Sequence, residues 1–326
     1  MTTRKTGPQG WTPEQLGSLE GRTYVITGAT AGAGFEATRV LLSKGAGVVM
    51  MNRNADKSAA TIKRLQQEFG TDVDVTAVTL DLAVLDSVRE AAARVLENVP
   101  RIDALLCNAA IAQVARQVIT VDGFESQLGV NHLGHFLLCG LLFERIDASN
   151  GRIVVVGSNA YKMGLKRIQF EDLNFDRNYS AWNAYAQSKL AQMMFAYELQ
   201  RRVRAAGNGV QVRVCHPGAS RTNLLQDTAS TFNKMVWSTL APLIAQSAEK
   251  GAWPEVMCAT EQGLRPEALY GPTKRAATVG PIGECPLLAL ALDQDAAAEL
   301  WAISEQKTLL SWSPGVDRVQ ASPQRA

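Results

Sequence analysis

The sequence predicts an α/β fold: a single domain with a doubly wound parallel sheet of about seven strands and helices on both faces. Three observations support this prediction. From Thr23 onward, short β-branched runs alternate with longer helical patterns, which is the order of elements in βαβ units. The strand candidates are almost continuously apolar, as expected where helices cover both faces of a sheet. No shift in composition divides the chain.

The elements alternate strictly up to residue 215. The predicted strands are Thr23–Thr27, Gly47–Met51, Val73–Thr79, Asp103–Cys107, Arg152–Val156 and Val210–Cys215. The predicted helices between them are Gly32–Lys44, 55–69, 84–98, Gly123–Ile146 and 182–205. The last of these ends in a basic cluster, Arg201, Arg202 and Arg204, with Gly207 following. Cations in a final turn and a glycine after it are typical of a helix C-terminus.

After residue 216 the alternation becomes looser. Helical stretches near 231–262 are followed by a short strand at Ala268–Tyr270 and a last helix over about 294–310. Residues 1–20 are polar and interrupted by glycine and proline, which predicts a flexible or surface-draped lead-in. We also expect a flexible C-terminal tail over 311–326.

The overall composition excludes several classes of protein. Lys and Arg total 33 against 31 Asp and Glu, a net charge of +2, whereas nucleic-acid-binding proteins usually carry a basic face. The five scattered cysteines form no Cys-x-x-Cys pair, which fits reduced thiols. The N-terminus lacks a signal peptide's apolar core, and the longest apolar run, Phe136–Phe143, is too short to span a bilayer. We therefore expect a cytoplasmic protein without stable membrane insertion.

A glycine-rich segment, Thr27–Gly34, directly follows the first predicted strand and reads Thr-Gly-Ala-Thr-Ala-Gly-Ala-Gly. Glycines in this position permit a tight turn and close approach of the backbone, so a pyrophosphate can lie at the N-terminus of the next helix. This is the arrangement of a Rossmann-type nucleotide-binding domain. The residues predicted to bind the nucleotide here are Gly28, Thr30, Ala31, Gly32 and Gly34.

The end of the second strand indicates which dinucleotide is bound. An Asp or Glu near this point usually contacts a free ribose 2′-hydroxyl, but here the chain reads Asn52-Arg53. Arg53 could instead bind a 2′-phosphate through charge-assisted hydrogen bonds; the alternative is a surface arginine at a strand end. The absence of an acid favours NADP(H).

Two later strand ends complete the predicted nucleotide site. Asp81-Leu82 follows the third strand, and its carboxylate either reaches the adenine edge or only forms the turn that opens the next helix. Asn108-Ala109 follows the fourth strand, where small residues let the chain pass close to a cofactor.

The candidate catalytic groups lie after the fourth strand. Tyr185 and Lys189 are four residues apart on one helical face. A nearby cation lowers the pKa of a phenol from about 10, so Tyr185 is a candidate acid for carbonyl reduction and base for alcohol oxidation. Ser158 directly follows the fifth strand, where its hydroxyl can hydrogen-bond a substrate oxygen. Asn131, inside an apolar helix, needs a partner, such as a water chain leading to Lys189.

The ordered set of motifs resembles the short-chain dehydrogenase/reductase family over roughly residues 20–310. The motifs are Thr-Gly-x-x-x-Gly-x-Gly, Asn-Ala after the fourth strand, the mid-helix Asn, Ser, Tyr-x-x-x-Lys and His216-Pro217-Gly218. The resemblance implies an oxidoreductase domain over 21–310 with the catalytic tetrad Asn131, Ser158, Tyr185 and Lys189. It also implies that Tyr185 and Lys189 contact the cofactor, the lysine at the nicotinamide ribose, and that Pro217, Gly218 and Thr222 flank the nicotinamide.

Particular motifs indicate a branch of the family. Val-Asn-His-Leu-Gly-His-Phe, the long interval from Ser158 to Tyr185 and Tyr-x-x-Ser-Lys-Leu-Ala resemble retinol dehydrogenases. Cys-Asn-Ala-Ala and Val-Gly-Ser also resemble light-dependent protochlorophyllide reductases. Ala33, Ala110 and Gly157 depart from the usual family residues, but none of them removes a tetrad group. The departures therefore concern the subfamily and leave the expected activity unchanged.

The segment over about 219–262 is where the family builds a lid and substrate region. In it, Phe232, Met235 or Val236, Leu240 and Leu243 fall at helical spacing, with Trp237 and Ile244 outside that stripe. This excess of apolar residues predicts a cleft for a small lipophilic aldehyde, ketone or secondary alcohol. The alternative is a stripe that only packs on the sheet. We expect the stretch from Met235 to Ala245 to cover substrate and not to dock on a membrane.

Other functions remain open at this point. One is C=C reduction of the protochlorophyllide reductase-like type, and another is a non-catalytic NADP(H)-binding redox sensor, which an intact tetrad disfavours. His132 and His135 are three residues apart, but no local carboxylate or cysteine completes a metal site, so we expect both to pack near the cofactor. Because relatives of this kind are often dimers or tetramers, the resemblance implies a homodimer or homotetramer.

Overall fold

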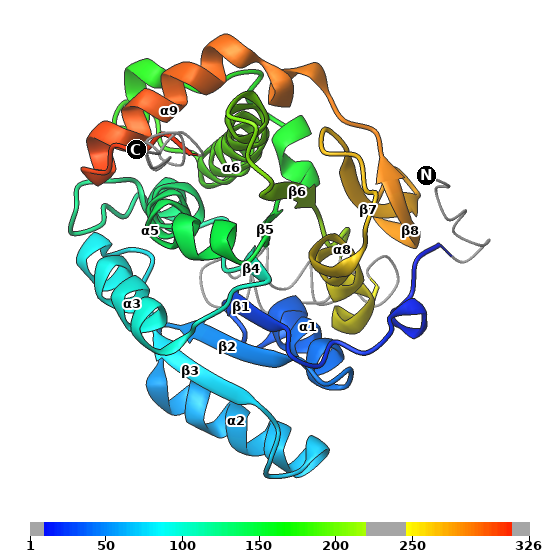
Figure 1. Cartoon of the computed structure of the whole chain (residues 1–326). Helices are drawn as coiled ribbons and strands as arrows, with labels where there is room; N and C mark the ends of the chain where they lie inside the picture. The colour runs from blue at the N-terminus through cyan, green and yellow to red at the C-terminus, as the bar shows by residue number, and fades with distance from the viewer. Residues whose placement is uncertain (1–9, 220–245, 315–326) are drawn as a thin grey trace, which may run out of the picture.

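The computed structural model describes residues 10–219 and 246–314. In these residues one eight-stranded sheet has the order β3-β2-β1-β4-β5-β6-β7-β8 (Figure 1). The strands are β1 (Thr23–Thr27), β2 (Gly47–Asn52), β3 (Val75–Thr79), β4 (Ala104–Cys107), β5 (Arg152–Val156), β6 (Gln211–Cys215), β7 (Leu269–Lys274) and β8 (Val279–Cys285). Every neighbouring pair is parallel except β7 and β8. The predicted doubly wound sheet is confirmed, with one strand more than expected.

The strand order reverses beside β1, which lies between β2 and β4. The chain first builds outward from β1 to β3 and then returns to add β4, β5 and β6 on the other side. Ligands of open α/β sheets bind beyond the carboxyl ends of the strands at such a reversal. The topology therefore places the ends of β1, β4, β5 and β6 around one site.

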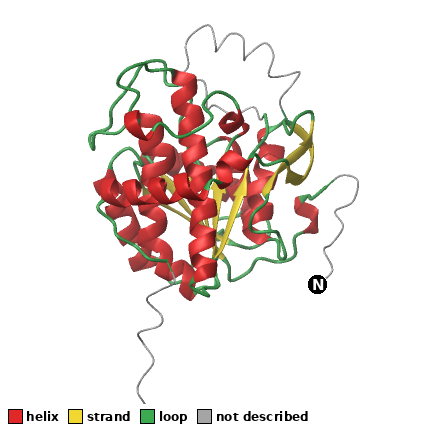
Figure 2. Ribbon diagram, turned by 90° about the horizontal axis from the view of Figure 1, so that it is seen from above, coloured by secondary structure: helices red, strands yellow, loops and turns green. Residues whose placement is uncertain are grey.

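Helices cover both faces of the sheet, as Figures 1 and 2 show. One face carries α1 (Gly32–Leu42), α2 (Ala55–Phe69) and α8 (Ala248–Thr260), and the other carries α3 (Leu85–Asn98), α5 (Gly134–Ala148) and α6 (Ala181–Ala205). Each face has its own hydrophobic core, which explains the near-continuous apolar strands. None of the described helices is long and apolar enough to cross a membrane.

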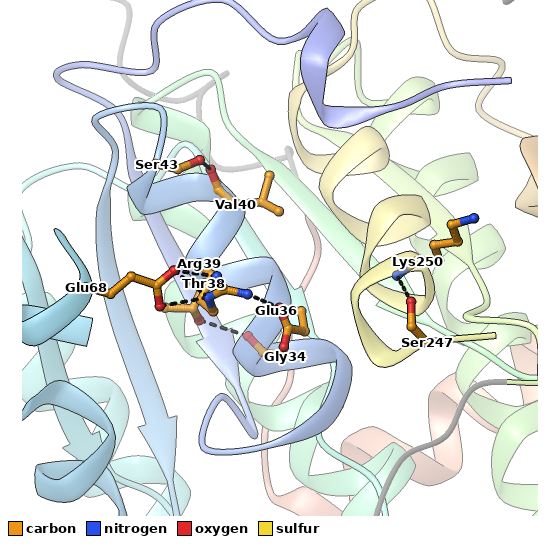
Figure 3. Close-up of polar contacts among 9 residues, drawn as sticks. All are labelled: Gly34, Glu36, Thr38, Arg39, Val40, Ser43, Glu68, Ser247 and Lys250. Carbon is orange, nitrogen blue, oxygen red and sulfur yellow. Dashed lines mark hydrogen bonds and ion pairs between the residues drawn. The ribbon is translucent and has the colours of Figure 1, made fainter. Parts of the chain in front are cut away.

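Ion pairs hold the first helices together at the surface. Arg39 of α1 pairs with Glu36 on the same helix and with Glu68 of α2 (Figure 3). On the other side of α1 lies α8, whose N-cap Ser247 accepts a hydrogen bond from the Lys250 backbone N–H. The ion pairs therefore lie on the C-terminal half of α1, and the opposite end of this helix is where the sequence predicts the pyrophosphate.

The sheet edge contains a strand that the sequence analysis missed. The predicted strand Ala268–Tyr270 is the start of β7, and β8 pairs antiparallel with it from Leu269 opposite Cys285. The β8 sequence Val-Gly-Pro-Ile-Gly-Glu-Cys contains two glycines and a proline, which argue against a central strand. An edge strand tolerates them because one of its sides forms no ladder.

The segments next to the chain ends pack against this frame. Trp11 is 2% exposed, and its backbone N–H donates to Ile282 O at 3.1 Å. Gly10 and Trp11 therefore lie against the sheet edge, in the segment for which we expected a flexible or surface-draped lead-in. Helix α9 (Gln294–Thr308) packs along α6. Trp312, in the expected flexible tail, stacks on Phe136 of α5, with 5.5 Å between the ring centroids. Buried apolar surface holds both indole rings in place.

Candidate active site

The turn between β1 and α1 has the shape of a phosphate cradle. Gly28 and Gly32 adopt φ values of +72° and +60°, which glycine reaches without strain. The N-cap of α1 is Ala31, whose side chain accepts no hydrogen bond, so the first-turn N–H groups are available to an anion. A Cβ on Gly34 would lie 2.4 Å from Asn108 Nδ2. The residues present thus fit a pyrophosphate at this helix end.

The side-chain amide of Asn52, which was not predicted to take part in the site, holds this turn in place. Asn52 ends β2, and its Oδ1 accepts the Ala29 backbone N–H at 2.7 Å. Its Nδ2 donates to Ser58 Oγ in α2 at 3.1 Å. Asn52 thus lies at the strand end near which an acid usually contacts a ribose hydroxyl, and its side chain holds the glycine-rich turn. A polar residue ending an otherwise apolar strand was the available signal.

Asn108 and Ala109 lie directly against the glycine-rich turn. Their backbone N–H groups donate to Thr27 Oγ1 at 3.0 and 2.9 Å. The Asn108 side chain also donates to Thr27 O at 2.8 Å. These bonds join the ends of β1 and β4 into one surface at the topological reversal.

His135 connects this surface with Asn131. Its Nδ1 lies 3.0 Å from Asn131 O, and its Nε2 lies 2.9 Å from Thr27 Oγ1. Because a carbonyl only accepts, Nδ1 carries the hydrogen and Nε2 accepts from the threonine hydroxyl. Burial lowers the pKa of His135 to about 4, so the ring is neutral at pH 7.

His132 contacts helix α9. Its Nε2 is 2.8 Å from Ser304 Oγ in α9, and its ring packs against Phe136 and Phe195. It therefore joins two helices through its side chain. Among the residues that the structure describes, no group of three His, Cys, Asp or Glu side chains could hold a metal ion.

Asn131 lies in a one-turn π-helical segment, η2 (Gly129–Leu133), between the short α4 (Ser126–Leu128) and α5. Such insertions in α-helices are frequent at functional sites. Its Oδ1 accepts from Ile111 N, and its Nδ2 donates to Ile111 O and Ser188 Oγ, all at 2.9 Å. The expectation that this buried amide needs a partner is met by these groups, and a water chain leading to Lys189 stays a prediction. The side chain joins the segment after β4 to helix α6.

Ser158 and Tyr185 meet where β5 ends. Ser158 opens the short helix η3 (Asn159–Lys162), and Tyr185 lies in the second turn of α6 in contact with Ala160 and Trp182. Burial raises the pKa of Tyr185, and a hydrogen bond with Ser158 partly offsets this. The two predicted catalytic hydroxyls are thus brought together, with the phenol held in its protonated form.

Lys189 lies one turn after Tyr185 and is 2% exposed. Its Nζ donates to Val156 O at 3.0 Å and to Gln192 Oε1 at 2.9 Å. Burial lowers its pKa to about 7. We expected its charge to lower the pKa of Tyr185, but burial dominates both groups. Each is shifted towards its neutral form, because a buried charge loses its hydration.

The remaining predicted residues lie around the same edge. Arg53 is exposed directly after β2. Asp81 Oδ1 accepts from Ala83 N at 2.9 Å, so it forms the turn before α3, while Leu82 beside it is buried.

Two hydrogen bonds hold the segment after β6, where the sequence predicts the nicotinamide end of the site. The Gly218 N–H donates to His216 Nδ1 at 3.1 Å, and Gln246 Nε2 donates to Pro217 O at 2.8 Å. Gln246 is not among the residues predicted from the sequence. Thr222 and the apolar stripe from Phe232 to Ile244 lie outside the described residues.

Known proteins resemble this chain in sequence and in architecture. A sequence model of the short chain dehydrogenase family matches residues 22–170. Human retinol dehydrogenase 13 is 36% identical over 88% of this chain and 84% of its own length. Mouse (Mus musculus) retinol dehydrogenase 14 is 38% identical over 89% and 86%. The crystal structure of an uncharacterized protein from Mycobacterium paratuberculosis is 38% identical, with a TM-score of 0.76 over 93% of this chain and 98% of that one. The chain therefore belongs to the short-chain dehydrogenase/reductase family, in its retinol dehydrogenase-like branch.

Proposed function

We propose that the protein is an NADP(H)-dependent oxidoreductase that interconverts a lipophilic aldehyde or ketone and the corresponding alcohol. The observation that carries the proposal is the meeting of Ser158 and Tyr185 at the carboxyl end of β5, with Lys189 one helical turn away. These groups lie beside the strand ends where a dinucleotide is expected. The names of the relatives refer to retinol, a lipophilic alcohol.

The nicotinamide cofactor supplies or accepts the hydride when it is bound. In carbonyl reduction, Tyr185 donates its phenolic proton to the oxygen of the substrate, and Ser158 donates a hydrogen bond to the same oxygen. A phenol whose pKa is raised by burial is protonated at neutral pH, which suits the acid role. Asn131 keeps the segment after β4 and helix α6 in register around this site.

The choice of NADP(H) over NAD(H) rests on the end of β2. Arg53 is exposed there, and no carboxylate occupies the strand end to contact a free 2′-hydroxyl. The preceding residue, Asn52, already holds the glycine-rich turn. A guanidinium in this position suits a 2′-phosphate. We further propose a cytoplasmic enzyme that forms a homodimer or homotetramer.

The test is a panel of lipophilic aldehydes and ketones with NADPH, in which cofactor oxidation and product identity are both measured. We expect alcohol products, with specificity constants rising with chain or ring size. Each buried methylene should contribute up to about 0.8 kcal/mol. Highest activity on small charged or polyhydroxylated carbonyls would contradict the lipophilic cleft. Saturated C=C products would indicate the protochlorophyllide reductase-like reaction, and tight NADPH binding without turnover would indicate a redox sensor.

A further inference from the structure

The side chain of Lys189 contacts that of Gln192, and the proposed reaction gives this contact no role. Gln192 lies almost one turn further along α6, and its Oε1 accepts a hydrogen bond from Lys189 Nζ at 2.9 Å. Both side chains are almost completely buried. Because an ammonium only donates, the oxygen of the amide must face it. The orientation of the Gln192 amide is thereby fixed, and its Nε2 is left without a hydrogen-bond partner among the described residues.

The other buried glutamines of α6 differ from Gln192 in their contacts. Gln187 accepts from Gln169 N and donates to Leu173 O, and Gln200 accepts from Val212 N. These two join the helix to neighbouring backbone. Gln192 has one hydrogen-bond partner among the described residues, and that partner is Lys189. A buried amide N–H without a partner is unfavourable, so an apolar residue would serve packing alone better.

The geometry around the ammonium shows what this contact does. Of the three N–H groups on Lys189, one points to Val156 O and one to Gln192 Oε1. We infer that Gln192 is a positioning residue, which holds the Lys189 ammonium so that its third N–H is directed to Tyr185 and the nicotinamide ribose. The inference rests on the proposed function, because it assigns Lys189 its place in that reaction.

The other groups that face Lys189 determine how much its charged form depends on the Gln192 oxygen. They are Cys107 from β4, Cys215 from β6, His135 from α5 and Tyr185 from its own helix. None of the four is a carboxylate, and His135 is neutral at pH 7. Besides the attraction of Cys215 and Cys107, the ammonium is stabilised by the oxygens of Val156 and Gln192, since hydrogen bonds to the charged form of a lysine favour it. Loss of the Gln192 oxygen should lower the pKa of Lys189 further below about 7.

The first experiment compares pH profiles of kcat, measured with NADPH and a lipophilic aldehyde. Gln192→Met keeps the length of the side chain and removes the acceptor, Gln192→Glu keeps an acceptor, and Gln200→Met makes the same change at a buried glutamine of α6 that does not contact Lys189. For Gln192→Met we expect kcat to fall about tenfold or more and the ionisation of Lys189 to move to lower pH. For Gln192→Glu the ionisation of Lys189 should move to higher pH, and kcat should stay close to that of the wild type. An unchanged profile in Gln192→Met, or an equal shift in Gln200→Met, would overturn the inference.

The second experiment needs no turnover. The pH dependence of unfolding is measured for Lys189→Met, Gln192→Met and the double variant, since it reports the pKa of Lys189 in the folded chain. We expect the effect of Gln192→Met on this pH dependence to vanish once Lys189 is replaced. Equal effects in both backgrounds would overturn the positioning role even in an active enzyme. A wild type inactive on every carbonyl would reject the proposed function and leave this result readable.

Discussion

The site is built from side chains whose surroundings determine their protonation. Tyr185 is buried against Ala160 and Trp182, and the pKa of its phenol is raised. Lys189 is buried one turn away, and its pKa is lowered to about 7. At pH 7 the phenol is therefore protonated, whereas the lysine is divided between its charged and neutral forms. A negatively charged cofactor nearby would favour the ammonium, so the pair should become polarised when the dinucleotide binds.

The role of Tyr185 as acid gives a test at a single atom. Tyr185→Phe removes the phenolic proton and leaves the ring in place, so kcat should fall by at least about a hundredfold. NADPH affinity, measured by calorimetry, should change little. Tyr197→Phe is the control, because that hydroxyl lies on the same helix but contacts Ala268 O at 3.4 Å. Near-normal turnover in Tyr185→Phe would place the acid elsewhere.

Arg53 gives a test of cofactor choice. Arg53→Ala should weaken NADPH binding by about 1.5–3 kcal/mol, the range for a lost hydrogen bond to a charged group. NADH binding should be almost unaffected, because it has no 2′-phosphate. Lys63→Ala, which removes an exposed cation from the third turn of α2, is the control for general electrostatics. Equal losses for the two cofactors would reject a 2′-phosphate contact.

The sequence predicts elements well where a single strand or helix carries its own signal. Strands β1 to β6 are predicted within two residues at each end, because their apolar runs alternate with clear helical patterns. Strand β8 is missed because its glycines and Pro281 resemble a loop, and only pairing with β7 makes it a strand. Trp312 is missed for a related reason, since its pocket exists only after α5, α6 and α9 have packed together.

Site residues, too, are predicted where the sequence around them carries its own signal. Ser158, Tyr185, Asn108 and the glycine-rich turn are found because each follows a strand or lies in a recognisable motif. The contacts of Asn52 and Gln192 are not, because they depend on how loops and helices pack around the sheet. The contacts of Asn131 are not predicted for the same reason, since Ile111 and Ser188 reach it from segments distant in sequence.

Gly140 gives a test at the scale of the α5 surface. A Cβ at this position would lie 2.0 Å from Cε3 of Trp312, so Gly140→Ala should displace the indole ring. We expect a loss of about 1–3 kcal/mol in the free energy of unfolding, measured by urea denaturation. In a Trp312→Ala background the same change should cost less, because the ring no longer has to move and the flexible Leu310 side chain, whose Cδ2 lies 2.3 Å from the added Cβ, is left to shift. An equal loss in both backgrounds would show that the ring is not the obstacle.

Across the whole molecule, buried titratable groups predict how stability depends on pH. All three histidines of the chain are buried, and burial lowers the pKa values of His132, His135 and His216 to about 3, 4 and 3. Below pH 6.5 the unfolded chain therefore binds protons that the folded chain does not. Glu255 acts in the opposite sense, because burial raises its pKa to about 8 and only its folded form holds a proton above pH 4.5.

Between pH 6.5 and 4.5 the unfolded chain approaches a net excess of two protons, so the free energy of unfolding should fall with decreasing pH. At full excess the slope is about 2.7 kcal/mol per pH unit. Urea denaturation at pH 7, 6 and 5 measures it. His132→Phe removes one histidine from an aromatic cluster and should flatten the slope by about one proton. Glu255→Gln removes the opposing group, so it should steepen the slope and stabilise the protein at pH 7. A stability that is flat over this interval would mean that the histidines are protonated in the folded chain, and their burial without charge partners makes that the unfavourable state.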